Sequence, residues 1–308
     1  MTMRIGINGT GLVLQASVDA VAEHAAQAAE DGFASYWLAE HPTGGFDALS
    51  VLALVGQRVA GIELGTAIVP MLPRHPLVLA GQALTARGVI GERLTLGIGL
   101  SHDMMMAQLG LNLDRPIAKL RDYLSVLMPL LNEGKVSFEG EFFSCQAEVF
   151  RKPSPPVPVL VAALGEQALR VAGTRTDGAT LAWVGPRTVR DHIRPRLADA
   201  AAKAGRPAPR ILATLPVCVT DEADKVRALV AKTLEMYGSL PAYRAMFERE
   251  GVAGPGELAL VGNEDEVRAR LGELADAGVT DFAASEFTPS KDERLRTRAL
   301  LKKCTDEG

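Results

Sequence analysis

The sequence predicts an α/β protein built as a (β/α)8 barrel, the TIM-barrel fold, with inserted segments after strands four and seven. Eight short strand-like runs alternate with helical segments along the 308 residues. Several runs are almost continuously apolar, as is required of strands covered by other layers on both faces. Eight such repeats favour a closed barrel over an open doubly wound sheet, which usually contains fewer strands.

The strands and the first helices follow from local pattern. The helix after the first strand should stop at Asp31-Gly32, where glycine accepts the left-handed turn that ends a helix. Asp47 is expected to open the next helix. The predicted strands are Arg4 to Asn8, Tyr36 to Glu40, Glu63 to Val69, Leu94 to Leu100, Val157 to Ala163, Gly178 to Trp183, Arg210 to Thr220 and Thr280 to Phe287.

Two stretches interrupt this rhythm. After strand four, residues 103–134 contain a long helical stretch, and Val136 to Cys145 indicates a hairpin around Glu139-Gly140. After strand seven, residues 222–251 and 264–278 form a second helical excursion. Pro289 is expected at the first position of a final helix. We expect residues 1–308 to form one barrel domain that carries both insertions.

Composition and charge argue against several classes of function. Charged residues make up 23% of the chain and the formal net charge is −4, so no basic field exists to attract nucleic acid or a membrane surface. A small-molecule substrate is expected instead. The three cysteines are scattered and odd in number, which fits a reducing compartment. Without a signal peptide or a membrane-spanning apolar segment, the chain is predicted to be cytoplasmic.

The residues directly after the strands are the candidates for chemistry, because these loops build the site at one face of a parallel barrel. His41 follows strand two beside Glu40, where an imidazole can transfer protons near neutral pH. An ordinary loop histidine bonded to its neighbours is the alternative. Ala163-Leu164-Gly165 offers backbone N–H groups at the start of a helix, which can hold a phosphate, although a simple glycine-containing turn has the same sequence. No histidine or cysteine spacing indicates a metal site.

Gly9-Thr10-Gly11 imitates part of a dinucleotide-binding fingerprint, and Glu40 stands where an acidic residue would bind the ribose. The third glycine of that fingerprint is replaced by Leu14, and the helix is expected to begin only near Ser17. A phosphate would then miss the helix N-terminus that the motif requires. An NAD(P)-dependent Rossmann dehydrogenase is kept as a rival interpretation.

Several longer segments carry a more specific signal when they are taken in order. They are Tyr36-Trp37-Leu38-Ala39-Glu40-His41, Leu64 to Pro70 followed by Arg74-His75-Pro76, Arg93 to Gly99, and Pro158 to Ala163 with Asp177-Gly178. The ordered set resembles the luciferase-like monooxygenase superfamily, especially its branch that uses the deazaflavin coenzyme F420. The resemblance covers nearly the whole chain.

The resemblance implies an isoalloxazine-like ring at the C-terminal mouth of the barrel, backed by a non-proline cis peptide at Ala67-Ile68. It places Glu40 and His41 near the reactive face as the catalytic residues, with His41 moving a proton and Glu40 orienting it. The residues assigned to cofactor binding are Asn8, Ala67, Ile68, Gly99, Leu100, Ser101, Ala163, Leu164, Gly165 and Trp183.

The implied function is hydride transfer between F420 and a small organic substrate. Sugar-phosphate dehydrogenases of this superfamily carry a catalytic carboxylate after the strand-four glycines, where this chain has Ser101-His102-Asp103, so a sugar phosphate is not indicated. An FMN-dependent monooxygenase is the first alternative, although such members are usually longer. A cofactor-binding protein without catalysis is another. Because family members are commonly dimers, a homodimer is expected.

Overall fold

The computed structural model of the chain describes residues 3–13, 17–41, 44–149 and 154–306. Its main sheet closes into a parallel barrel, because β1 pairs with both β2 and β12. This confirms the predicted fold class. The barrel strands in order around the ring are β1 (Arg4–Asn8), β2 (Ser35–Leu38), β3 (Glu63–Thr66), β5 (Leu94–Gly99), β8 (Val159–Ala162), β9 (Gly178–Ala182), β10 (Arg210–Val219) and β12 (Asp281–Glu286).

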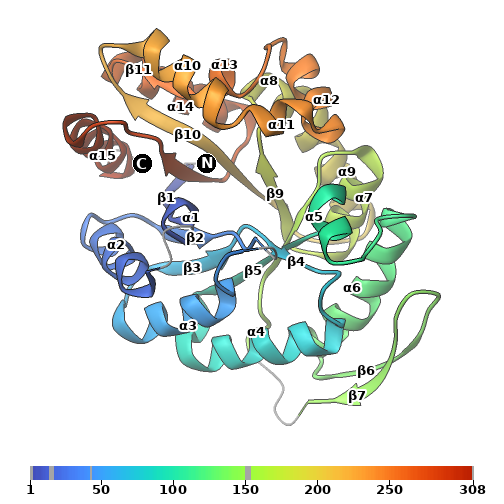
Figure 1. The fold of residues 1–308 in the computed structure, drawn as a ribbon. Helices are drawn as coiled ribbons and strands as arrows, with labels where there is room; N and C mark the ends of the chain where they lie inside the picture. The colour runs from blue at the N-terminus through green and yellow to red at the C-terminus, as the bar shows by residue number, and fades with distance from the viewer. Residues whose placement is uncertain (1–2, 14–16, 42–43, 150–153, 307–308) are drawn as a thin grey trace.

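Helices surround this barrel (Figure 1). They are α1 (Thr10–Val13), α2 (Val18–Glu30), α3 (Ala48–Arg58), α4 (Pro76–Ile90), α5 (Asp103–Gln108), α6 (Pro116–Asn132), α7 (Glu166–Arg175), α8 (Pro186–Thr188), α9 (Arg194–Lys203), α10 (Ala223–Thr233), α11 (Glu235–Ser239), α12 (Pro241–Glu250), α13 (Pro255–Leu258), α14 (Glu264–Ala277) and α15 (Lys291–Asp306). A 3₁₀ turn, Gly91–Arg93, and a π-helical turn, Val189–Ile193, join the set. Within the described ranges, no helix has the length and apolar character needed to cross a membrane.

Local side-chain chemistry sets the helix ends. Asp47 caps α3 as predicted, since its carboxylate accepts a hydrogen bond of 2.7 Å from the Ser50 N–H. Gly32 follows α2 with φ +84°, the left-handed conformation expected there. The prediction that Pro289 begins the last helix was wrong. Ser290 caps that helix instead, accepting from the Glu293 N–H at 3.2 Å, so α15 begins at Lys291.

The third predicted strand and the two insertions contain more separate elements than the sequence suggested. Predicted strand three ends at Thr66, and a short strand β4 (Val69–Pro70) follows the Ala67-Ile68 peptide. The hairpin after α6 is present as β6 (Lys135–Glu139) and β7 (Ser144–Glu148). A strand that the sequence analysis missed, β11 (Leu260–Gly262), extends the sheet along the C-terminal half of β10.

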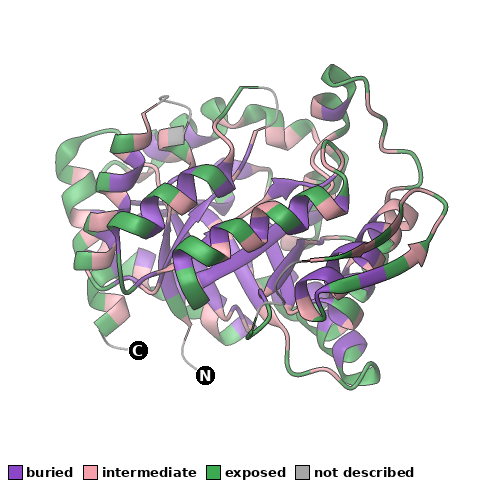
Figure 2. Ribbon diagram, turned by 90° about the horizontal axis from the view of Figure 1, so that it is seen from below, coloured by how far each residue is buried: buried purple, intermediate pink, exposed green. Residues whose placement is uncertain are grey.

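The hydrophobic core has two parts, one outside and one inside the ring of strands. The larger part lies between strands and helices, and Figure 2 shows buried strands enclosed by helices whose outer faces are exposed. The smaller part fills the barrel with Trp37, Leu160, Leu212 and Ala283. Since alternate residues of a strand face the same side, the residues one pair further along these strands, Ala162, Thr214 and Ser285, also face the inside. Toward its C-terminal mouth the barrel interior is therefore lined by small side chains, which leave room there.

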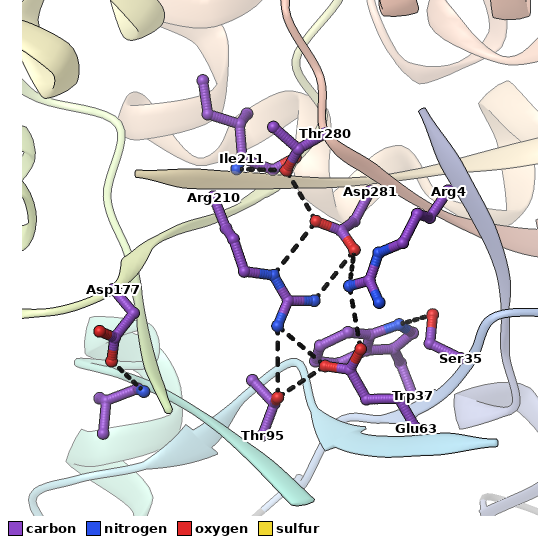
Figure 3. A network of polar contacts seen from close by, with 11 residues as sticks. Arg4, Ser35, Trp37, Glu63, Thr95, Asp177, Arg210, Ile211, Thr280 and Asp281 are labelled. Carbon is purple, nitrogen blue, oxygen red and sulfur yellow. Dashed lines mark hydrogen bonds and ion pairs between the residues drawn. The ribbon is translucent and has the colours of Figure 1, made fainter. Parts of the chain in front are cut away.

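A charged network closes the opposite, N-terminal end of the barrel (Figure 3). Arg210 donates to Asp281 at 2.9 and 3.2 Å and to Glu63 at 2.9 Å. Arg4 pairs with both carboxylates as well. Burial alone would raise the pKa of Asp281, but hydrogen bonds from Arg210 and Thr280 and the charge of Arg210 outweigh it, and the pKa lies below its usual value. This end of the barrel is a structural plug.

We expect Arg210→Met to destabilise the protein by about 2–3 kcal/mol, because it leaves the buried Asp281 carboxylate with one cation where it had two. Urea denaturation monitored by circular dichroism measures the loss. Lys203→Met is the matched control, since the Lys203–Asp199 pair is exposed and is worth about 0.5 kcal/mol or less. Equal effects of the two substitutions would contradict the structural role of the plug.

Candidate active site

The residues singled out after the strands lie together at the C-terminal mouth. Because every barrel strand is parallel to its neighbours, His41, Ser101 and Trp183 follow strand ends on the same rim. The segment 163–165 follows β8 on that rim, and Asn8 ends β1 there. Glu286 at the end of β12 points elsewhere: its carboxylate bonds His24 and Arg298 in the helix layer.

The Ala67-Ile68 peptide is cis, as the sequence resemblance predicted. Its backbone is tied to β2 on both sides: the Ala67 N–H donates to the Leu38 carbonyl at 2.8 Å, and the Ile68 carbonyl accepts from the Glu40 N–H at 2.9 Å. Ala67 and Ile68 are half-buried, whereas the flanking Thr66 and Val69 are fully buried. The bulge therefore presents its surface to the mouth.

Gly99 at the end of β5 leaves room beside this bulge. A Cβ placed there would stand 2.9 Å from the Ala162 Cβ and 3.2 Å from the Ile68 Cδ1. Nearby, the Thr214 Oγ1 is buried and has no hydrogen-bond partner within the described part of the chain. A surface of small side chains with an unpartnered hydroxyl suits a flat polar ring. These residues therefore fit a flavin-like group.

The turn from β8 into α7 fits the anionic end of such a group. Gly165 is the N-cap of α7 and supplies no side chain to bond the helix N–H groups. Its backbone has φ −81° and ψ 154°, and a Cβ built on it would meet nothing within 4 Å. The Leu164 carbonyl faces away from this space and accepts from the His192 Nε2 at 2.8 Å. The uncapped N-terminus of α7 can therefore bind an anion.

Glu40, the neighbour of His41, is held by an ion pair and a backbone hydrogen bond. Glu40 Oε1 pairs with Arg74 at 2.7 Å, and its Oε2 accepts from the Ala48 N–H at 3.2 Å. Arg74 also binds Asp47 at 2.6 Å. The carboxylate of Glu40 is thus engaged by Arg74 and by the start of α3, and its expected role in orienting His41 stays a prediction.

Glu40 acts on His41 through its charge. Burial lowers the pKa of His41, and the negative charge of Glu40 opposes that shift only in part. The imidazole is therefore mainly neutral at pH 7, while Glu40 is placed to stabilise it when it gains a proton.

The Gly9-Thr10-Gly11 turn has a structural explanation. A Cβ on Gly9 would stand 1.9 Å from the Tyr36 hydroxyl, so glycine makes room for that ring. The Asn8 Oδ1 accepts from the Thr10 N–H, and the Thr10 Oγ1 accepts from the Ala39 N–H, both at 2.9 Å. The long helix begins at Val18, as expected, and the sheet is closed. These findings overturn the Rossmann alternative; Leu14 itself lies outside the described residues.

Two residues at the mouth have unusual backbone conformations. Ser101 has φ +65° and Trp183 has φ +60°, the left-handed region that non-glycine residues rarely adopt. The Ser101 hydroxyl lies 3.7 Å from the Met105 sulfur, and Leu100 packs on the core. Such conformations are common at ligand sites, where the surrounding structure enforces them.

Three residues at the mouth were not assigned to the site from the sequence. They are His102, Tyr237 and Tyr243, and with Trp183 they form a group of contacting rings, here termed the aromatic wall. The His102 ring lies 5.6 Å from Tyr243 and 6.3 Å from Tyr237, and Tyr237 lies 5.0 Å from Trp183. The position of His102 directly after a strand was the one available signal; nothing local marks the tyrosines.

Two hollows on the surface lie away from this mouth. One of about 420 Å³ lies between α10 and α15, where Arg296 is already paired with Asp221 and Glu264. The other, of about 750 Å³, lies between α6 and the β6–β7 hairpin. Neither is lined by a residue that the sequence assigned to catalysis or cofactor binding, so neither is included in the candidate site.

Comparison with known proteins identifies the family of the chain. The sequence profile of the family described as luciferase-like monooxygenase matches residues 3–281. Two relatives named F420-dependent glucose-6-phosphate dehydrogenase align as well. The Nakamurella multipartita protein is 30% identical over 222 residues, 68% of this chain and 66% of the relative, just under two thirds of its length. The Beutenbergia cavernae protein is 31% identical over 280 residues, 86% of this chain and 78% of the relative.

Solved structures share the fold. The coenzyme F420-dependent tetrahydromethanopterin reductase from Methanopyrus kandleri superposes with a TM-score of 0.82 at 20% identity, covering 100% of this chain and 99% of that one. The oxygenating constituent of 3,6-diketocamphane monooxygenase from Pseudomonas putida, in complex with FMN, gives 0.77 at 16% identity, covering 99% and 98%. At these identities the likeness establishes the fold alone.

Proposed function

Because the chain belongs to the luciferase-like monooxygenase family, we propose that it is an oxidoreductase that moves a hydride between bound coenzyme F420 and a small organic substrate. The observation that carries the proposal is the position of His41 on the same rim of the barrel as Gly99 and the Ala67-Ile68 bulge, where a flat ring can lie. The names of the sequence relatives support F420 as the cofactor. We place the enzyme in the cytoplasm, because its three cysteines are scattered and odd in number, as fits a reducing compartment; cell fractionation tests this placement.

The mouth residues divide into two groups in this proposal. Ala67, Ile68 and Gly99 would hold the ring, with Asn8, Leu100, Ser101 and Trp183 around it. Ala163, Leu164 and Gly165 would hold the phosphate end through backbone N–H groups. When bound, the deazaflavin supplies hydride chemistry; the protein supplies position and charge.

His41 moves the proton that accompanies the hydride. In substrate oxidation, a C–H bond of an alcohol breaks and its electron pair leaves with the hydride. The O–H proton passes to a neutral imidazole nitrogen of His41, and the product is a carbonyl compound. In the reverse direction, the protonated imidazole returns that proton to the carbonyl oxygen. The negative charge of Glu40 stabilises the protonated imidazole in both directions.

An FMN-dependent monooxygenase is the second candidate, and the likeness to the FMN-bound Pseudomonas structure favours it. Such an enzyme would consume oxygen during turnover, whereas deazaflavin hydride transfer would not. A protein that binds the cofactor without catalysis would show neither oxygen consumption nor hydride exchange with any acceptor. Anaerobic and aerobic assays with the same substrate separate the three.

We expect the purified protein to bind F420 at least about tenfold more tightly than FMN. The reason is that two relatives at 30% and 31% identity carry F420 in their names. Side-by-side titrations followed by absorbance and fluorescence give both dissociation constants. Tighter binding of FMN, together with oxygen uptake, would move the assignment to the monooxygenase.

We also propose a homodimer formed through α3 and α4. These adjacent helices expose Leu54, Val78 and Val89 by 46%, 54% and 38%, and exposed apolar side chains that cluster on neighbouring helices commonly mark an interface. Analytical ultracentrifugation of the purified protein tests this; a monomer at micromolar concentration would contradict it.

A further inference from the structure

We propose that the aromatic wall formed by His102, Trp183, Tyr237 and Tyr243 recognises the substrate, and that it selects an uncharged compound with an aromatic or conjugated ring beside the reacting carbonyl or hydroxyl. The inference rests on the proposed function for the position of the reacting carbon. It deepens that function by naming a substrate class.

The wall is assembled from three separate parts of the chain. His102 follows β5, Trp183 follows β9, and the tyrosines come from α11 and α12 of the second insertion. Figure 1 shows α11 and α12 on the same side of the barrel as α5. The wall therefore spans the rim from the fourth to the sixth barrel strand, above the Ala163-Leu164-Gly165 turn.

The two tyrosine hydroxyls of the wall are available to a ligand. Tyr237 and Tyr243 contact each other at 5.7 Å in an edge-to-face arrangement. Neither hydroxyl has a hydrogen-bond partner among the residues that the structure describes, although a phenol hydroxyl can both donate and accept a hydrogen bond. Burial raises the pKa of both phenols, so both stay protonated and can donate to a substrate oxygen.

The backbone supports a binding role. Trp183 itself has a left-handed conformation, and Ser101, immediately before His102, has another. Aromatic residues that only pack against a barrel do not need this conformation, which is unfavourable for residues other than glycine. The chain therefore has a strained residue at each of the two strand ends that contribute to the wall, Ser101 after β5 and Trp183 after β9.

The wall carries no cation for a phosphorylated substrate. Burial lowers the pKa of His102, the nearby His41 lowers it further, and Asp103 opposes the shift in part. Both imidazoles are therefore mainly neutral at pH 7. Arg74, behind His41, is already paired with Glu40 and Asp47. A sugar phosphate would lose its hydration here without gaining a counter-charge, whereas an aromatic ring would gain ring–ring contacts.

The test uses binding, which does not depend on turnover. Acetophenone and cyclohexyl methyl ketone share a methyl ketone and nearly the same volume, and only the first has an aromatic ring. On protein loaded with F420, we expect saturation-transfer NMR and calorimetry to give acetophenone a dissociation constant about three- to tenfold lower, the usual range for aromatic contacts. Glucose 6-phosphate should not compete with it.

Two variants separate recognition from packing. Tyr237→Leu removes the hydroxyl and the ring together, so it should weaken acetophenone by about three- to tenfold more than cyclohexyl methyl ketone and abolish the preference, with the F420 affinity within about twofold. Tyr237→Phe should retain the ring preference and weaken both ketones equally, because both lose the same hydrogen-bond donor. If Tyr237→Leu weakens the two ketones equally, or if wild type shows no preference, the wall is only packing and the inference is wrong.

The cofactor titration keeps this result distinct from the proposed function. If F420 binds and no ketone preference exists, only the inference fails. If F420 does not bind and acetophenone still binds through Tyr237, the wall stands and the cofactor assignment fails.

Discussion

Replacing His41 with alanine should lower turnover by about 10²–10⁴-fold, the usual worth of a positioned acid or base, and leave the cofactor dissociation constant within about threefold. In the proposed mechanism the imidazole handles the proton that accompanies the hydride, while the bulge at Ile68 and the α7 N-terminus would hold the cofactor. Loss of the proton acceptor therefore slows chemistry more than binding. Steady-state kinetics at saturating cofactor, with a parallel binding titration, measures both quantities.

Two further variants support this reading. His41→Gln keeps a hydrogen-bonding side chain but cannot be protonated near neutral pH, so it should be as slow as alanine. His75→Asn is the matched control, because His75 is an exposed N-cap of α4 and asparagine keeps the capping function. A His41 variant that loses cofactor binding but retains its rate at saturation would make His41 a binding residue.

The pH dependence of the turnover rate tests the role of His41 in proton transfer. Because burial lowers its pKa below the usual 6.5, substrate oxidation, which needs the neutral imidazole, should rise with pH through a midpoint below 6.5 and stay level from pH 7 upward. Substrate reduction needs the protonated form and should fall over the same interval. His41→Gln should remove this pH dependence from both substrate oxidation and substrate reduction.

The sequence was sufficient for the barrel because its information is local. Each strand is an apolar run, and caps such as Asp47 and Gly32 act within a few residues. The cis peptide at Ala67-Ile68 came from the family resemblance rather than from local pattern. The short strand β11 was missed because three residues of strand sequence inside a helical insertion give no periodic signal.

The side-chain partners at the site could not be predicted in this way. Glu40 and His41 are neighbours in sequence, but consecutive residues at a strand end point in different directions, and adjacency does not give the ion-pair partner of Glu40. The partner of Glu40 is Arg74, which arrives from the loop after β4. Tyr237 and Tyr243 reach His102 only because the second insertion folds back over the rim. Contacts of this kind depend on the closed fold.

Gly165→Asp should weaken cofactor binding by about 10²–10³-fold without destabilising the protein. Aspartate is a favoured N-cap and accepts hydrogen bonds from the first N–H groups of a helix, so it would occupy the donors that the phosphate needs and add a like charge. The backbone at Gly165 has φ −81°, which any residue adopts, and a Cβ there meets nothing within 4 Å. Stability should therefore be unchanged or higher by a few tenths of a kcal/mol.

Gly165→Ser separates the two effects, because serine caps the helix without a charge. It should weaken the cofactor by about tenfold at most and should match the aspartate variant in thermal stability. Calorimetric titration with F420 and thermal denaturation of the protein without added cofactor give the two quantities independently. If the aspartate variant binds F420 as tightly as the wild type, the phosphate does not lie at the N-terminus of α7, and the orientation proposed for the cofactor across the mouth must be reversed. If instead binding and stability fall together in both variants, Gly165 is required by the fold and reports nothing about the ligand.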